Sequence, residues 1–241
     1  MQYLDHAATS PMRPEATAAM REALDAFGNP SSLHRYGQQA KSRVEAARAE
    51  IAVSLGAEAV EVVLTSGGTE AINLALVGRF CATGSDRNVI VVPEGEHHAV
   101  LDTVEWLERV HGAQIAWVPL TRGGRIDEAA WTRALDEHAG RIALATAIWV
   151  NNETGTIQPV DALADLTGRA GIALHLDAVA AYGHERIDFA ALQTRNPDTL
   201  VSVSAHKIGG PQGVGALLVP RTTSLEAHLH GGGQQRKLRA G

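Results

Sequence analysis

A regular alternation of strand-like and helix-like segments most constrains how this chain can fold. Between residues 61 and 219, short apolar runs typical of strands alternate with longer stretches whose apolar residues recur at helical spacing. This alternation predicts βαβ units, and therefore an α/β fold with a mostly parallel sheet and helices on both faces. The expected strands are residues 61–65, 88–92, 114–120, 141–150, 172–177, 200–204 and 214–219, and the expected helices between them are 69–80, 97–111, 127–138 and 160–170.

The part of the chain before this alternation is expected to be helical. Helical patterns cover residues 14–27 and about 38–55, and a proline stands at the start of the first, where a missing N–H costs nothing. We therefore divide the chain into an N-terminal segment (1–13), N-terminal helices (14–56) and one large α/β domain (57–241).

Charge and composition exclude several classes of function. The formal net charge is −6, which gives no electrostatic footprint for nucleic acid or for an anionic membrane surface. No apolar run approaches the roughly 20 residues that span a bilayer, and the first residues do not resemble a signal peptide. The single cysteine, Cys81, cannot form an internal disulfide and rules out a cysteine-based zinc cluster. These features favour a cytoplasmic protein.

Ligands of such sheets bind beyond the carboxyl ends of the strands, so the residues that follow each strand are informative. The first expected strand is followed by Ser66-Gly67-Gly68-Thr69-Glu70 and then by a helix. Glycines let a ligand approach the backbone, and the free N–H groups of a helix start attract phosphate. The alternative is a plain strand–helix turn in which Thr69 is the N-cap.

Three further strand ends carry polar residues that are open to more than one interpretation. His97 and His98 suggest a metal site, but adjacent helical residues do not face each other and no nearby acidic or cysteine ligand completes a set, so no metal is expected. A histidine that caps the helix is the simpler alternative. Asn152 either belongs to a polar turn or binds a carboxylate or a phenolic oxygen. Asp177 either caps a helix or pairs with a buried cation.

The most informative segment is Ser202-Val203-Ser204-Ala205-His206-Lys207, which follows an apolar strand and precedes a Gly-Pro turn. A lysine at a strand end within a sheet crevice is a candidate for imine formation with a carbonyl. A phosphate-binding turn, an aspartate for a protonated ring nitrogen and an imine-forming lysine are the requirements of pyridoxal 5'-phosphate. The sequence therefore predicts this cofactor.

These motifs, together with three further segments of the chain, resemble those of the cysteine desulfurases of the class V aminotransferase family. The match extends over essentially the whole chain, and several ordered motifs are more specific than any one of them. The resemblance implies the major domain of a fold-type I pyridoxal phosphate-dependent transferase. The matching segments are residues 3–9, 28–32, 65–70, 151–155, 202–207 and 230–234.

The resemblance also assigns roles in catalysis. It implies that Lys207 binds the cofactor as an imine and moves the proton of the substrate α-carbon. It implies that Asp177 pairs with the ring nitrogen, and that His97 stacks on the ring and takes part in proton transfer. Asn152 is expected to contact the cofactor and to hold the substrate carboxylate.

The phosphate site is expected to consist of Gly68, Thr69, Ser204 and His206. Members of the family take sulfur from L-cysteine and leave L-alanine and an enzyme persulfide. The sulfur then passes to an acceptor protein, an iron–sulfur cluster scaffold or a tRNA-thiolation protein. The resemblance further implies a homodimer in which the loop 231–235 points across the subunit interface.

The chain departs from the family pattern in three ways. Ala180 stands where the family has a glutamine that donates to the phenolic oxygen of the cofactor. The sequence ends at Gly241, where the family continues with a small C-terminal domain. That domain carries the catalytic cysteine and an arginine for the substrate carboxylate. Cys81 is expected to be a half-buried structural thiol and no substitute for the catalytic cysteine.

Two alternatives follow from these departures. Because of Ala180, another class V aminotransferase or a selenocysteine lyase-type enzyme is an alternative interpretation. A substrate screen distinguishes either of them from a desulfurase. The absent cysteine keeps open a non-catalytic remnant, which is expected to expose apolar surface and to be sticky or partly unfolded.

Overall fold

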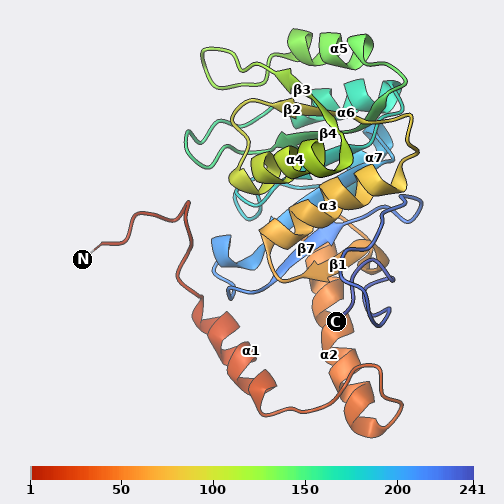
Figure 1. Cartoon of the computed structure of the whole chain (residues 1–241). Coiled ribbons are helices and arrows are strands. Elements are labelled where there is room, and N and C mark those ends of the chain that lie inside the picture. The colour runs from red at the N-terminus through yellow and green to blue at the C-terminus, as the bar shows by residue number, and fades with distance from the viewer. Residues whose placement is uncertain (1) are drawn as a thin grey trace.

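In a computed structural model, which describes residues 2–241, the chain folds around one seven-stranded sheet (Figure 1). The strands are β1 (Val62–Thr65), β2 (Val89–Pro93), β3 (Gln114–Val118), β4 (Ile142–Ile148), β5 (Leu174–Asp177), β6 (Thr199–Ser204) and β7 (Gly215–Leu218). The α-helices are α1 (Pro14–Leu24), α2 (Arg35–Ser54), α3 (Gly68–Ala82), α4 (His98–His111), α5 (Glu128–Glu137), α6 (Val160–Arg169) and α7 (Phe189–Arg195). Two short 3-10 helices are η1 (Ala59–Glu61) and η2 (Ala205–Lys207).

The sheet is mostly parallel and confirms the predicted α/β class. Its strand order is β1-β7-β6-β5-β4-β2-β3. The pairs β3–β2, β2–β4, β4–β5 and β5–β6 are parallel, whereas β7 is antiparallel to both β6 and β1. The carboxyl ends of β2, β4, β5 and β6 therefore lie along the same edge of the sheet, next to the turn that leaves β1.

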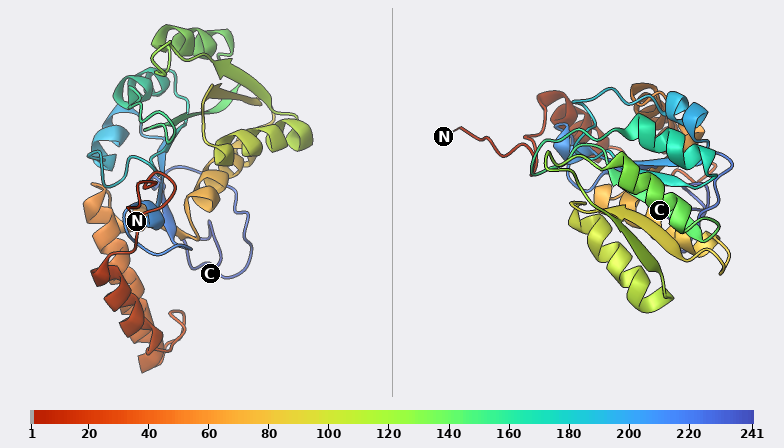
Figure 2. Two further views of the ribbon diagram at one scale, coloured as in Figure 1. Left: turned by 90° about the vertical axis from the view of Figure 1, so that its left-hand side faces the viewer. Right: turned by 90° about the horizontal axis from the view of Figure 1, so that it is seen from above.

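Helices cover both faces of the sheet, as predicted. The two layers are visible when the molecule is turned (Figure 2). One face packs against α3 and α4, where Ile72, Leu76 and Val100 belong to one core cluster. The other face packs against α2, α5, α6 and α7, and buries Trp131 and Phe189 completely. The central strands have apolar residues on both faces because both faces are covered.

Some element boundaries differ from the predictions. The first helix ends at Leu24 and not at residue 27, and α2 begins at Arg35, three residues before the expected start. The sequence pattern did not indicate α7, a seven-residue helix capped by Asp188, whose side chain accepts a hydrogen bond from the Ala191 N–H. Asparagine, proline and aspartate around this short segment obscure its helical period.

Helix α1 and the loop that follows it lie apart from the sheet (Figures 1 and 2). None of the described residues of α1 is buried. Large apolar side chains are exposed here, including Leu24, Phe27 and Leu33. Two backbone hydrogen bonds tie the segment to the body, from Ser10 N–H to His206 O and from Arg13 N–H to Gly209 O, each 2.8 Å long. In the part of the chain described, no helix is long and apolar enough to cross a membrane.

Candidate active site

A cavity of about 460 Å³ opens at the carboxyl edge of the parallel strands. Its walls come from the N-terminal segment, the start of α3, the β2–α4 connection, the ends of β4 and β5, and η2. Seven of the eight predicted site residues line it: Gly68, Thr69, His97, Asn152, Asp177, His206 and Lys207. The eighth, Ser204, is buried directly behind the start of α3. The topology therefore brings the predicted residues together from five separate segments.

The glycine turn places the start of α3 at the cavity. Gly67 is the N-cap of α3 and makes no side-chain capping bond, so the alternative in which Thr69 is the N-cap is wrong. Thr69 is the second helical residue and is exposed to the cavity. The first N–H groups of a helix have no intrahelical acceptor and carry the positive end of the helix dipole. The turn thus offers amide donors and a hydroxyl to an anion.

Two further donors lie near this turn: Ser204 packs against it, and His206 lines the same cavity. A Cβ at Gly68 would lie 3.4 Å from the Ser204 Cβ, so the Ser204 side chain packs against the helix start. The Ser204 Oγ is buried and has no hydrogen-bond partner among residues 2–241. His206 bonds Thr9 Oγ1 through Nδ1 at 3.1 Å, which leaves Nε2 for a ligand. Burial and the nearby Lys207 lower the pKa of His206.

Asp177 ends β5 and is a buried carboxyl group that lines the cavity. Its Oδ1 accepts a hydrogen bond from the Val179 N–H at 3.0 Å, so it does cap the following turn. Burial raises the pKa of Asp177, while the Val179 N–H, His97 and Lys207 oppose that rise. A carboxylate so placed stabilises a cation in the cavity, such as a protonated ring nitrogen.

Lys207 lies at the end of η2, just beyond β6, and lines the cavity. Its ammonium donates to the backbone oxygen of Ala7, on the N-terminal segment. Burial lowers the pKa of Lys207, although Asp177, Asp5 and Glu153 oppose the shift. A lowered pKa increases the fraction of neutral amine, which is the nucleophilic and basic form.

His97 and Asn152 complete the polar lining. His97 is the N-cap of α4, and its Nδ1 accepts a hydrogen bond from the Ala99 N–H at 3.0 Å. His97 therefore caps α4 and lines the cavity at the same time, since capping uses only its Nδ1. Asn152 donates to Glu153 Oε1 at 2.9 Å at the rim. Its neighbour Asn151 is structural, because its Nδ2 donates to the Gly95 carbonyl at 2.9 Å.

Sequence reasoning assigned no role to Glu96, which is buried directly before His97. Its Oε1 accepts a hydrogen bond from the Ile148 N–H at 2.7 Å, while its Oε2 is buried without a partner within residues 2–241. Burial raises the pKa of Glu96 to about 8, with a smaller rise from Asp177 that the Ile148 bond opposes. The side chain is therefore neutral at pH 7. Its adjacency to two histidines was the only signal in the sequence.

His175 was also not predicted as a site residue. It lies on β5 two residues before Asp177, and therefore on the same face of the strand. Its two ring nitrogens lie 2.8 Å from Thr146 Oγ1 on β4 and 2.8 Å from Ser202 Oγ on β6. Burial lowers the pKa of His175 to about 3. A polar triplet thus crosses three strands beneath the cavity, marked in the sequence only by a histidine within an apolar run.

Ala180 and Cys81 bear on the departures from the family pattern. Ala180 lines the cavity, so the position where the family has glutamine does face the site, but its side chain carries no donor.

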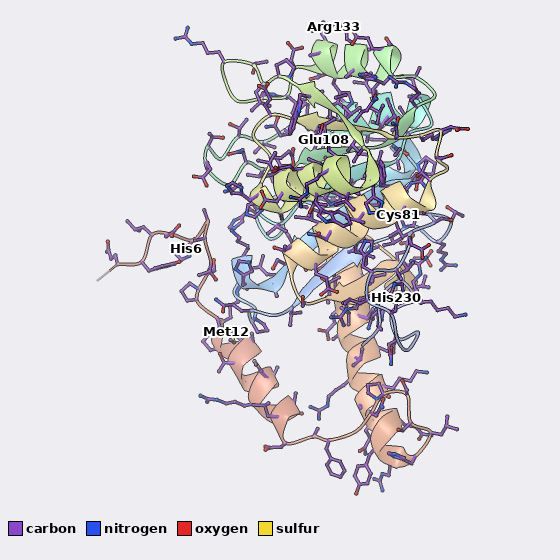
Figure 3. The ribbon with its side chains drawn as sticks, in the orientation of Figure 1. His6, Met12, Cys81, Glu108, Arg133 and His230 are labelled. Carbon is purple, nitrogen blue, oxygen red and sulfur yellow. The ribbon has the colours of Figure 1, made fainter. Side chains whose placement is uncertain are left out.

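Cys81 is exposed at the far end of α3, which corrects the expected half-buried thiol (Figure 3). Thirteen residues at 1.5 Å per residue place it about 20 Å along the helix from Gly68.

The donor set fits pyridoxal phosphate. The amide groups of the α3 start and the buried, unpartnered Ser204 Oγ suit a phosphate. The buried carboxylate of Asp177 suits a protonated pyridine nitrogen, and Lys207 suits the aldehyde. The groups that would hold the cofactor therefore come together at one cavity.

Comparison with known proteins agrees with this chemistry. An IscS-like cysteine desulfurase from Mycobacterium tuberculosis is 44% identical over 244 residues, which cover 100% of this chain and 61% of the relative. A cysteine desulfurase from Cereibacter sphaeroides is 42% identical over 241 residues, or 99% of this chain and 60% of the relative. The chain thus spans about three fifths of the length of these curated relatives.

Solved structures show the same fold. A NifS-like protein superposes with a TM-score of 0.92 at 31% identity, covering 99% of this chain and 64% of that one. A structure titled SspA in complex with cysteine gives a TM-score of 0.93 at 32% identity, covering 100% and 68%. The sequence profile of the aminotransferase class-V family, whose members depend on pyridoxal phosphate, matches residues 2–239. The chain therefore belongs to the class V aminotransferase family.

Proposed function

We propose that residues 57–241 form the pyridoxal phosphate-binding domain of a cysteine desulfurase that acts on L-cysteine. The observation that carries the proposal is the cavity in which Lys207 and Asp177 lie beside the anion-binding start of α3. The relatives named as cysteine desulfurases support the reaction, and a related structure is titled as a complex with cysteine.

The proposed binding roles follow the donors of the cavity. Gly68, Thr69, Ser204 and His206 bind the cofactor phosphate, because the first three present amide and hydroxyl groups at the start of α3 and the His206 imidazole lines the same cavity. Asn152 lies at the rim and supplies an amide to the cofactor and to the substrate carboxylate.

The proposed chemical roles belong to three residues around the ring position. When bound, the cofactor supplies an electron sink for negative charge at the substrate α-carbon. Asp177 maintains that capacity by holding a proton at the ring nitrogen. Lys207 anchors the cofactor and moves a proton at the substrate α-carbon. His97 stacks on the ring and assists proton transfer through Nε2, since its Nδ1 is held by the Ala99 N–H.

Removal of the sulfur requires a thiolate. Its attack on the substrate sulfur forms an S–S bond and breaks the C–S bond, and the carbon gains a proton to give alanine. Cys81 is unsuited to this attack, because it lies about 20 Å along α3 from the cavity, and partial burial together with the Glu226 carboxylate raises its pKa. We propose that a different cysteine receives the sulfur, and that a homodimer passes it to an iron–sulfur scaffold or a tRNA-thiolation protein.

The visible spectrum of the chain after incubation with pyridoxal phosphate and removal of the excess tests the cofactor site. We expect a yellow absorption band that is retained by the wild-type chain and absent from Lys207→Ala, because only the lysine amine attaches the aldehyde. Lys41→Ala, on the exposed surface of α2, removes a lysine outside the cavity and is expected to keep the band.

The absence of a band from the wild-type chain, or its persistence in Lys207→Ala, would contradict the proposal. A substrate screen then separates the reactions of the family. If the desulfurase assignment is right, L-cysteine gives alanine when a small thiol is added to replace the missing cysteine thiolate. That thiol takes the substrate sulfur as a persulfide, and a second thiol molecule then releases it as sulfide and forms a disulfide. Keto-acid formation from an amino donor would instead favour an aminotransferase.

A further inference from the structure

Glu70 lies close to the proposed phosphate site, where its negative charge would repel a bound phosphate. It is the third residue of α3, one position beyond Thr69. Its Oε2 accepts a hydrogen bond of 2.7 Å from the Ser66 N–H, at the start of the glycine turn. Glu70 therefore fixes the backbone that leads into the helix start. Its negative charge, however, lies within one helical turn of the amides that would bind a phosphate dianion.

Arg239 neutralises this carboxylate from 169 residues away in the sequence. Its Nε donates to Glu70 Oε1 at 2.7 Å and its Nη2 donates to Oε2 at 3.3 Å, which is a two-point contact. Both side chains are about four-fifths buried. Burial raises the pKa of Glu70, but the hydrogen bonds from Arg239 and Ser66 outweigh it and hold the pKa below its ordinary value. Glu70 is thus ionised and paired.

The segment that carries Arg239 is fastened to the edge of the sheet. Gln235, expected in a loop pointing toward a partner subunit, is buried against its own chain. Its Oε1 accepts from the Leu64 N–H at 3.1 Å and from Arg48 Nη1 at 3.0 Å. The Gln235 N–H donates to the Arg239 carbonyl at 3.2 Å. Residues 235–239 therefore lie beside β1 and α2, next to the glycine turn (Figure 1).

We propose that Glu70 and Arg239 form a positioning pair for the phosphate group of the cofactor. Glu70 holds the Ser66 amide and thereby the glycine turn, and Arg239 cancels the charge that would otherwise repel the phosphate. The inference rests on the proposed cofactor site and adds two residues to it. Neither residue lines the cavity, so both act through the turn and through the local field.

If Arg239 acts by cancelling the charge of Glu70, variants of the two residues should differ in their affinity for pyridoxal phosphate. Arg239→Ala leaves an unpaired carboxylate beside the phosphate, and we expect it to weaken pyridoxal phosphate binding about tenfold or more. Glu70→Gln keeps an oxygen for the Ser66 N–H but carries no charge, so its affinity stays within about threefold of the wild type. The double variant Glu70→Gln/Arg239→Ala recovers most of the lost affinity. Pyridoxal, which lacks the phosphate, binds all four proteins about equally.

A second measurement needs no cofactor. Hydrogen exchange of the Ser66 amide reports directly on its bond to Glu70. We expect faster exchange in Glu70→Ala than in the wild type, and near wild-type exchange in Glu70→Gln, because the glutamine oxygen still accepts the bond. Arg195→Ala is the matched control, since it removes an arginine that pairs with Asp161 and Asp165 on helix α6, against the other face of the sheet.

Three results would overturn the inference. One is a double variant that binds pyridoxal phosphate as weakly as Arg239→Ala, which indicates lost packing and not lost charge balance. Another is an equal loss for pyridoxal and for pyridoxal phosphate. The third is unchanged Ser66 exchange in Glu70→Ala. A wild-type chain that binds no cofactor contradicts the proposed function, and with it the phosphate part of this inference, whereas the Ser66 exchange tests the turn separately.

Discussion

Glu96 and His175 are two buried titratable side chains whose pKa values lie far from their ordinary ranges in opposite directions. Burial raises the pKa of Glu96 to about 8 and lowers that of His175 to about 3, so both are neutral at pH 7. Asp177 is the buried carboxyl group that shares the cavity with Lys207. A neutral Glu96 matters to Asp177, because a second ionised carboxylate nearby would raise the pKa of Asp177 further.

The pH dependence of stability should reveal Glu96. Its folded pKa of about 8 exceeds its unfolded value, so its contribution to stability is complete below pH 4.5 and is lost as the pH rises toward 8. His175 acts in the opposite sense, but only below about pH 6.5. Between pH 6.5 and 8 His175 does not change its charge, so the difference between the wild type and a Glu96 variant reports on Glu96. We expect Glu96→Gln to remove roughly 1–2 kcal/mol of the stability loss across that window.

Urea unfolding of the wild type and of Glu96→Gln at pH 6.5 and pH 8 measures this difference. Glu105→Gln, at an exposed position of α4, controls for the loss of a carboxylate. Equal pH dependence in the wild type and in Glu96→Gln would show that Glu96 is ionised in the folded protein.

Single residues differ in how far the sequence reveals them. Lys207, Asp177 and His97 could be predicted as a group, because each lies at the end of an expected strand or within five residues of it, and strand ends meet at one edge. Glu96 and His175 could not be assigned, since their behaviour depends on burial by elements distant in sequence. Arg239 is a similar case, because its partner Glu70 is 169 residues away.

Among the elements, the glycine turn and β7 approach each other unusually closely. A Cβ at Gly215 would lie 2.5 Å from the carbonyl carbon of Gly67, and the atoms it meets are all backbone. Any side chain on β7 at this position must therefore push the turn away from the sheet. The close approach fixes where α3 begins, and with it the direction of its free amides.

We expect Gly215→Ala to destabilise the chain by about 1–3 kcal/mol, the usual cost of overpacking. It should also weaken pyridoxal phosphate binding, because the displaced turn carries Gly68 and Thr69. Chemical denaturation and cofactor titration measure the two effects. Gly84→Ala is the control, as a Cβ at Gly84 meets nothing within 4 Å. Wild-type behaviour of Gly215→Ala would mean that the turn is not held by β7.

The element pattern predicted the central parallel strands and their helices well, because burial on both faces produces continuous apolar runs. It could not show that β7 is antiparallel to β6 and β1, since strand direction leaves no mark in a four-residue apolar run. The seven-residue helix α7 was missed for a related reason, as it spans only two turns.

Across the whole molecule, the cavity joins segments from the N-terminal residues to η2. A cofactor that binds only the folded state stabilises that state by mass action. We expect pyridoxal phosphate to raise the melting temperature of the chain, by an amount equivalent to about 2.7 kcal/mol when the free cofactor is at 100 times its Kd. Differential scanning fluorimetry of the wild type and of Lys207→Ala measures this effect. A melting temperature indifferent to the cofactor in the wild type would contradict the prediction.

The backbone bonds of Ser10 and Arg13 lie on either side of Lys207, at residues 206 and 209. The first residues of the chain are thus attached to the body at the cavity itself, while α1 buries none of its described residues. Thermodynamic coupling between two events is reciprocal. We therefore expect a ligand that orders the backbone around Lys207 to immobilise the N-terminal residues as well. A probe attached near Tyr3 would then report whether the cavity is occupied.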